Sequence, residues 1–154
     1  MQVSSQVAQH LLDVCTGGNW TDACVTQTLE DISWEEAGTV TIASPNSIAA
    51  LTHHLSFWNR VMIQRINGIN PEIPESNGFN VGTISGDAEW KALISDLLIS
   101  ASELAIAIRD IDEDKLDEPI APGQSTLYKN IQGTVEHIHY HLGQMVIIKK
   151  LIRA

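Results

Sequence analysis

The sequence predicts an all-α protein, a four-helix bundle with long crossover connections. Four segments repeat large apolar residues every three or four positions, which is the spacing of one face of an α-helix. No segment alternates apolar and polar residues as a half-buried strand does. The 154 residues, 44% hydrophobic and 18% charged, have the composition of a globular chain. We therefore expect residues 1–154 to form a single domain.

Two helices are expected in the first half of the chain. The first carries its apolar residues over positions 3–14 and stops at the glycine pair at 17–18. The second begins at Ser44, because Ser44 and Pro45 suit the cap and first position of a helix, and it ends before Gly68.

Two longer helices are expected in the second half. The first spans residues 90–108, with Asp87 as its N-cap, and the second spans residues 125–152. Residues 69–86 are rich in Pro, Gly, Asn and Ser, so they are expected to form a long crossover loop. A short helical turn is also indicated by the capping-box spacing at residues 33–36.

The charge and cysteine content exclude several classes of protein. A net charge of −10 without any basic run argues against binding to nucleic acid or to an anionic membrane surface. No stretch of 18 apolar residues could span a bilayer, and residues 1–18 lack the pattern of a signal peptide. Cys15 and Cys24 match no disulfide framework or metal motif. We expect a cytoplasmic protein with two reduced, buried thiols.

The six histidines are grouped in a way that helix geometry can sort. His137 and His141 are four residues apart, so both imidazoles can converge on one point, whereas His139 projects elsewhere. On the earlier helix, His54 lies roughly 100° from the centre of the buried stripe and His53 roughly 160°. His54 is therefore expected to turn inward and His53 to face water.

Two histidines from one helix and one from another form a three-nitrogen set with open coordination positions. This pattern is typical of a catalytic divalent metal site rather than a closed structural one. Hydrogen-bonded histidines without a metal are the alternative, and the spacing alone leaves both possibilities open. The chain has no HExxH sequence, which argues against a zinc protease.

Several motifs resemble one known family. Residues 137–144, HIHYHLGQ, resemble the H-x-x-Y-H-x-G-Q signature of the DinB/YfiT-like superfamily. Ser47 and Ile48, followed by residues 54–58, resemble its S-I…H-[hydrophobic]-x-x-W segment. Further marks lie in the expected order at Gly18-Asn19-Trp20, at Arg65-Ile66-Asn67-Gly68 and at Trp90.

The resemblance implies a four-helix bundle, often dimeric, with a three-histidine divalent metal site. His54, His137 and His141 match its ligand positions, whereas His139 falls at a variable one. Members with known activities include thiol-dependent S-transferases, thiol-dependent isomerases and metal-dependent hydrolases. The implied cofactors are a divalent metal ion, zinc first with nickel or iron as alternatives, and a low-molecular-weight thiol as cosubstrate.

The expected function is transfer of a small thiol to an electrophilic small-molecule substrate. A metal at an open site deprotonates a bound thiol and lowers the pKa of bound water. The same residues therefore also suit a metal-dependent hydrolase, and a non-catalytic metal or small-molecule binding protein is a third possibility. We expect substrate-contacting residues in the loops at 17–46 and 69–86. No catalytic residue beyond the ligands is assigned.

Other residues near the motifs receive weaker assignments. Gln144 either orients a bound ligand or one of the metal-binding histidines, or it is an exposed helix residue. Trp58 and Trp20 either wall a pocket near the metal or belong to the core. Tyr140 is expected to pack or to contact a second copy of the chain. The apolar residues 146–148 lie outside the main stripe, which favours a homodimer.

Overall fold

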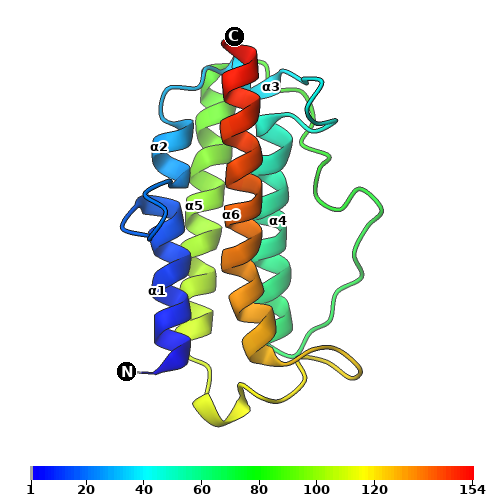
Figure 1. Ribbon diagram of the computed structural model, residues 1–154. Helices are drawn as coiled ribbons and strands as arrows, with labels where there is room; N and C mark the ends of the chain where they lie inside the picture. Colours follow the sequence, from blue (N-terminus) through cyan, green and yellow to red (C-terminus); the bar gives the residue numbers. More distant parts are fainter. Residues whose placement is uncertain (1) are drawn as a thin grey trace.

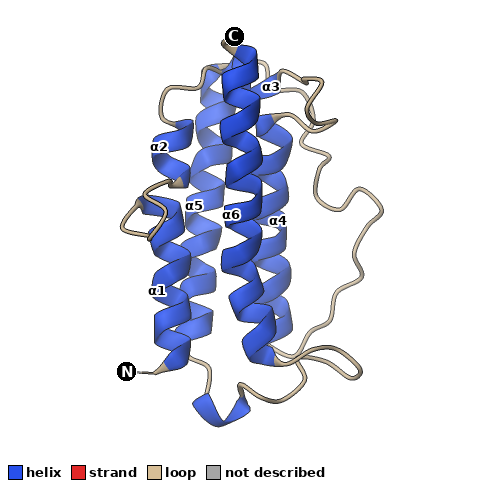
Figure 2. Cartoon of the chain, viewed as in Figure 1, coloured by secondary structure: helices blue, strands red, loops and turns tan. Residues whose placement is uncertain are grey.

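The computed structural model describes residues 2–154, which form helices joined by loops (Figures 1 and 2). The described residues contain no strand, only isolated bridges between Thr41 and Ser44 and between Pro119 and Thr126. The all-α prediction is therefore confirmed. The elements are α1 (Val3–Thr16), α2 (Val25–Leu29), α3 (Trp34–Gly38), α4 (Ile48–Ile66), α5 (Asp87–Arg109), the 3-10 helix η1 (Glu113–Lys115) and α6 (Leu127–Ile152).

The long helices α1, α4, α5 and α6 lie side by side (Figure 1). Helix α5 contacts α1 and α4, and α6 also contacts α1 and α4, so the four helices surround one common core. Helices α4 and α5 run in the same direction, because the loop 69–86 returns along the outside of α4 to the opposite end of the molecule (Figure 1). Helix α2 continues the side occupied by α1, and α3 lies near the C-terminal end of α6.

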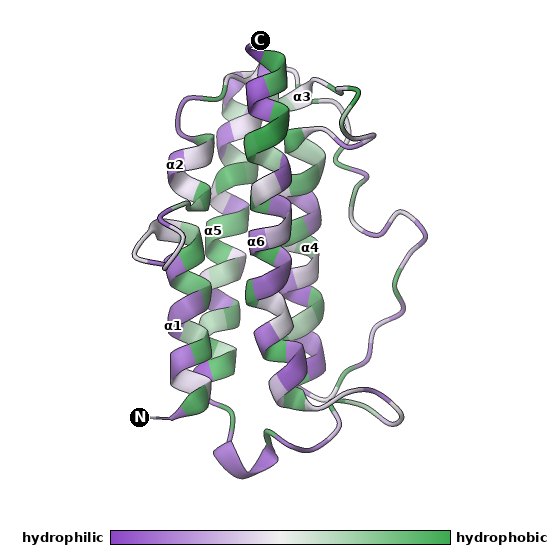
Figure 3. Cartoon of the chain, in the orientation of Figure 1, coloured by the Kyte–Doolittle hydropathy of each residue, from purple (hydrophilic) through white to green (hydrophobic). Residues whose placement is uncertain are grey.

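The core consists of the apolar stripes that the periodicity predicted. Each long helix alternates hydrophobic and hydrophilic residues along its length (Figure 3), and the hydrophobic ones turn inward. Trp90 is buried at the start of α5, where its indole Nε1 donates a hydrogen bond to the backbone oxygen of Ile32 over 2.9 Å. The largest fully buried aliphatic side chains are Leu11, Leu29, Ile48, Leu51, Leu55, Leu97, Leu104, Ile108, Ile131 and Ile138.

Two predicted helix starts are wrong by a few residues. Helix α4 is capped by Ser47, whose hydroxyl accepts a hydrogen bond from the backbone N–H of Ala50 over 3.2 Å. Ser44 instead belongs to a tight turn, because its backbone N–H donates to the oxygen of Thr41. Helix α5 has Gly86 as its N-cap, and Asp87, predicted as the cap, is its first helical residue.

Helix α3 and the end of α6 are joined by charged side chains. The predicted capping box is present, since Ser33 and Glu36 exchange side-chain and backbone hydrogen bonds. Arg153 forms ion pairs with Asp31 and Glu36, and Lys149 also pairs with Asp31. These contacts fix the C-terminal turn of α6 against residues 31–36.

Other expectations about the chain have mixed outcomes. Cys15 and Cys24 are both free and buried, as predicted. Ile148, predicted to lie outside the main stripe, is only 1% exposed and belongs to the core, whereas its neighbour Ile147 is exposed. Among the described residues, no helix combines the length and the apolar composition that crossing a membrane requires.

Candidate metal centre

Three histidines from two helices meet between α4 and α6. The Nε2 atom of His137 lies 3.0 Å from Nε2 of His54 and 3.0 Å from Nε2 of His141. One ring nitrogen of each residue lies within 4.8 Å of those of the other two. His54 and His141 are nearly buried, at 3% and 6% exposed, and His137 is half-buried. The structure thus brings together the three histidines whose convergence helix spacing predicted.

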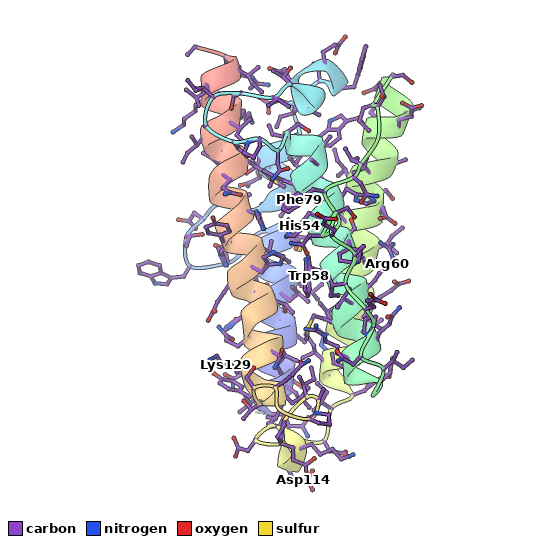
Figure 4. The ribbon with its side chains drawn as sticks, turned by 90° about the vertical axis from the view of Figure 1, so that its right-hand side faces the viewer. His54, Trp58, Arg60, Phe79, Asp114 and Lys129 are labelled. Atoms are coloured by element: carbon purple, nitrogen blue, oxygen red, sulfur yellow. The ribbon has the colours of Figure 1, made fainter. Side chains whose placement is uncertain are left out.

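The imidazole of His54 is held by the loop 69–86. Its Nδ1 lies 2.6 Å from the backbone oxygen of Asn77, and a carbonyl oxygen can only accept, so Nδ1 carries the proton. Phe79 stacks on the ring, with centroids 3.9 Å apart and planes inclined by 4° (Figure 4). The contacts leave the Nε2 lone pair of His54 free and directed towards His137.

The imidazole of His141 is oriented from its own helix. Its Nδ1 donates to the side-chain oxygen Oε1 of Gln144 over 2.7 Å, which also leaves Nε2 as the atom with a free lone pair. The Gln144 amide in turn donates to the hydroxyl of Tyr140 over 3.3 Å. Gln144 is thus hydrogen-bonded to His141, which agrees with the predicted role of a residue that orients a metal-binding histidine.

Burial shifts the pKa of all three imidazoles below the ordinary value of 6.5, which favours their neutral form at pH 7. Burial, opposed by the hydrogen bond to the Asn77 carbonyl and aided by the nearby His141 and His53, lowers the pKa of His54 from 6.5 to about 4. Burial lowers the pKa of His137 to about 4, aided by His141 and His54. Burial also lowers the pKa of His141, although its hydrogen bond to Gln144 opposes that shift. Neutral imidazoles are the form that binds metal ions.

The arrangement fits a metal ion better than it fits hydrogen bonds alone. With protons on Nδ1 of His54 and His141, only His137 can supply a proton to the three clustered Nε2 atoms, and one proton can satisfy one neighbour. The Nε2 lone pair of the other neighbour would then face the Nε2 atom of His137 without a proton between them. Two nitrogens bound to one zinc ion at about 2.0–2.1 Å lie roughly 2.9–3.4 Å apart, which includes the observed 3.0 Å. The three histidines could therefore hold a divalent ion.

The turn at residues 74–79 places the loop against α4. Asn77 and Gly78 both have positive φ, at 50° and 78°, which suits an asparagine-glycine pair. The side-chain oxygen of Asn77 accepts a hydrogen bond from the indole Nε1 of Trp58 over 3.0 Å. A Cβ atom at Gly78 would lie 2.7 Å from the ring of Phe57. Only glycine lets the loop approach α4 this closely.

The remaining histidines and one tryptophan lie outside the cluster. His139 is directed to the backbone oxygen of Val135, 3.2 Å from its Nδ1, as its predicted divergence requires. His53 was predicted to face water, but it is half-buried and its Nδ1 lies 2.6 Å from the oxygen of Gly78. That prediction is wrong because the loop covers this side of α4. Trp20 is 97% exposed, so it neither walls the site nor belongs to the core.

A cavity of about 370 Å³ adjoins the cluster on the side of His137. Trp58 lines the cavity next to the cluster, with its ring centroid 6.2 Å from that of His137 and 6.4 Å from that of His54. Figure 4 shows Trp58 next to His54, between α4 and α6. The cavity is lined by Trp58, Asn59, Met62, Arg65, Ser125, Lys129, Asn130, Gly133, Thr134, Glu136 and His137.

Asn77 and Phe79 were not singled out from the sequence. The Asn-Gly pair at 77–78 indicates a turn, and the loop 69–86 was expected to contact the substrate, but neither signal says which helix the loop packs against. The side chain that stacks on an imidazole more than twenty residues away cannot be identified from local pattern.

A family model described as the DinB superfamily matches residues 19–145, a region that includes all three clustered histidines. The chain belongs to the DinB superfamily. The match confirms the resemblance recognised in the histidine motifs, and a metal site agrees with membership of this superfamily. No curated protein matches the sequence. No solved structure matches it.

Proposed function

We propose that this DinB-superfamily protein is a metal-dependent enzyme that transfers a small thiol to an electrophile. The observation that carries the proposal is the convergence of three imidazoles: Nε2 of His137 lies 3.0 Å from Nε2 of His54 and 3.0 Å from Nε2 of His141, and all three residues place a ring nitrogen within 4.8 Å of the others. His54, His137 and His141 would hold a divalent ion, zinc first with nickel or iron as alternatives. When bound, such an ion lowers the pKa of a coordinated thiol or water, so that either can act as a nucleophile near neutral pH.

The surrounding residues would keep the ligands in place and limit access by water. Asn77 and Gln144 accept the Nδ1 protons of His54 and His141, which fixes both rings with Nε2 towards the ion. Phe79 covers one face of His54, and Trp58 stands beside His137. The two aromatic rings provide an apolar wall against which a substrate can bind.

The donor set favours a thiol over water as the nucleophile. Among residues 2–154, the three-histidine group includes no carboxylate that could serve as a general base. A thiol needs less help than water, because its ordinary pKa is about 8.5. In the proposed transfer the thiol releases its proton to solvent, its sulfur forms a bond to carbon, and the leaving group departs with the electrons of the broken bond.

Hydrolysis is a second candidate because Glu136 lines the cavity beside His137. Its carboxylate is exposed and could accept a proton from a water molecule that attacks an ester or amide. This candidate uses the same three ligands and differs only in the nucleophile.

The experiment that separates the candidates measures turnover by the zinc-loaded protein. An electrophile such as 1-chloro-2,4-dinitrobenzene is supplied with and without cysteine or glutathione, and p-nitrophenyl acetate is supplied without thiol. Thiol-dependent loss of the first substrate, absent from the His137→Ala variant, supports S-transfer. Ester cleavage without thiol by the wild type, absent from the His137→Ala variant, would instead support hydrolysis as the function and contradict S-transfer. Bound metal with neither reaction would identify a binding protein and overturn both.

The homodimer expected from the sequence remains a proposal. Ile147 and Leu151 are exposed near the end of α6, at 56% and 44%, and Tyr140 is exposed on the same helix. A second copy of the chain covering this face would bury these side chains. Light scattering during gel filtration measures the mass directly, and a mass of 16.9 kDa at micromolar concentration would contradict the dimer. The cytoplasmic location likewise remains a proposal.

A further inference from the structure

The cavity beside His137 runs away from the histidine cluster along the groove between α4 and α6. Helices α4 and α6 are antiparallel, so residues that follow His54 on α4 face residues that precede His137 on α6 (Figure 1). Trp58 lies at the cluster end of the cavity, and Arg65 and Lys129 are its cationic residues. Figure 4 shows Lys129 at the end of α6 remote from the C-terminus, below Trp58.

Arg65 and Lys129 are two of the four cationic residues that form no ion pair among the described residues, and the other two, Arg109 and Lys150, do not line this cavity. The chain has nine Lys and Arg residues against nineteen Asp and Glu. Arg65 and Lys129 form no ion pair within residues 2–154, and both line this one cavity. The cations that do form ion pairs are Arg60, Lys91, Lys115, Lys149 and Arg153.

The guanidinium of Arg65 is held in place before any ligand binds. Its Cζ atom lies 5.5 Å from the centre of the Trp58 ring, within the range of a cation–π contact. The indole of Trp58 is itself fixed by its hydrogen bond to Asn77. The Nε atom of Arg65 is buried and has no hydrogen-bond partner among the described residues. A buried donor without an acceptor is costly. Because Arg65 also lines the cavity, its guanidinium can offer charge-assisted hydrogen bonds to an anionic ligand there.

The charged residues around the cavity favour a ligand group that carries one negative charge. Arg65 and Lys129 contribute two positive charges, and the carboxylate of Glu136 contributes one negative charge. A carboxylate balances the remaining positive charge, whereas a phosphate dianion would leave an excess of negative charge near Glu136. A planar carboxylate also suits the fork of hydrogen-bond donors that a guanidinium presents.

We propose that Arg65 and Lys129 bind the carboxylate of the thiol cosubstrate, whose sulfur reaches the three histidines at the other end of the cavity. This inference rests on the proposed function, because it takes the ligand to be a thiol at the histidine site. It names the class of that ligand: a small thiol that carries a carboxylate several bonds from its sulfur.

The test compares two thiols that differ only at the far end, 6-mercaptohexanoate and 6-mercaptohexan-1-ol. Each is titrated into cobalt-loaded protein, and binding is followed by the near-ultraviolet absorption of a thiolate on cobalt. The carboxylate thiol should bind about 10-fold more tightly at low salt, and the preference should shrink as salt screens the charges. Arg65→Gln should remove most of the preference and Lys129→Gln part of it, while Arg65→Lys should retain part.

The matched control is Lys150→Gln. This substitution removes one positive charge from α6, the helix of Lys129, at a position outside the cavity. This variant should keep the full preference, which separates a local contact from a change in net charge. Lys129 is exposed, so its variant should fold even if Arg65→Gln is damaged. Equal affinity of the wild type for the two thiols would overturn this inference and leave S-transfer standing. Bound cobalt without a thiolate signal from either thiol would overturn S-transfer itself.

Discussion

The α1–α5 and α4–α6 pairs are built on the same plan but serve different purposes. Both are antiparallel helix pairs that contribute apolar stripes to the core (Figures 1 and 3). The first buries aliphatic side chains such as Leu11 and Leu104. The second also buries the polar rings of His54 and His141. The same helix-pair arrangement can therefore bury only aliphatic side chains or can also bury polar rings. The residues that face the core decide whether a helix pair only packs or also forms a site.

The polar pair needs support that the apolar pair does not. Buried imidazoles require hydrogen-bond acceptors, and Asn77 and Gln144 supply them to His54 and His141. One acceptor comes from the same helix and the other from a loop that returns along the outside of α4. The site thus takes its ligands and their hydrogen-bond acceptors from three segments of chain: α4, α6 and the loop 69–86.

Replacing His137 by alanine should have the largest effect on the site. His137 lies 3.0 Å from both other nitrogens, so its loss removes the central member of the set. We expect metal affinity to fall at least about 1000-fold, more than the 10- to 100-fold typical of residues behind the ligands. Metal analysis after dialysis measures this. His139→Ala is the control and should retain stoichiometric metal; an emptied site in this variant would show that the cluster is not the site.

Replacing Leu104 by alanine should show the opposite pattern. Leu104 is fully buried on α5, so the cavity left behind should lower the free energy of unfolding by about 2–5 kcal/mol. Urea unfolding measures the loss. Metal affinity of the folded protein should stay within about threefold of the wild type, because Leu104 lies on α5, which supplies neither the histidines nor their hydrogen-bond acceptors. A large loss of metal affinity would mean that the two regions are coupled.

Gly78→Ala tests whether the loop 69–86 is part of the site. The new Cβ would lie 2.7 Å from the ring of Phe57 at a positive φ, so the loop must move and draw Asn77 away from His54. We expect about 2 kcal/mol of destabilisation and roughly 10-fold weaker metal binding. Gly82→Ala is the matched control, because Gly82 has a similar positive φ with open space around it. Equal effects of the two substitutions on metal affinity would contradict the supporting role of the loop.

Gln144→Leu should weaken metal binding by about 10-fold without destabilising the bundle. The substitution removes the acceptor of the Nδ1 proton of His141 and frees the ring to turn. Tyr140→Phe removes only the hydroxyl that the Gln144 amide donates to, so it should change the affinity less than threefold. Calorimetric titration with zinc compares them. The reverse order would show that Tyr140, and not Gln144, orients the site.

The metal-free protein should lose stability as the pH falls from 6.5 towards 4. His54 and His137 have pKa values of about 4 in the folded protein against 6.5 ordinarily, so in this range the unfolded chain binds more protons. The urea midpoint in the presence of a chelator should drop by roughly 1–2 M between pH 7 and pH 5. A variant with asparagine at both positions should show a smaller drop. An identical pH dependence of the two proteins would contradict the role assigned to these rings.

The sequence was most informative where a regular helix converts spacing into direction. The i, i+4 spacing of His137 and His141 was enough to predict that both rings converge. The same reasoning separated His54 from His53 but misplaced the surroundings of His53, because angular position on a helix does not reveal a loop that covers it. The start of α4 was misplaced for a related reason, since Ser44 and Ser47 are both good caps and only the turn at Thr41 excludes the first.

The sequence by itself determined the helical class and the inward direction of the three histidines, because amphipathic periodicity and residue spacing are properties of a single helix. It determined the superfamily through the resemblance of the motifs around His54 and at residues 137–144. Only the tertiary structure decided that Asn77 and Phe79 hold His54, and that Arg65 and Lys129 line the cavity beside His137. These contacts join α4 to a distant loop and to another helix. They depend on how the loop returns and how the helices pack, and no local pattern encodes either.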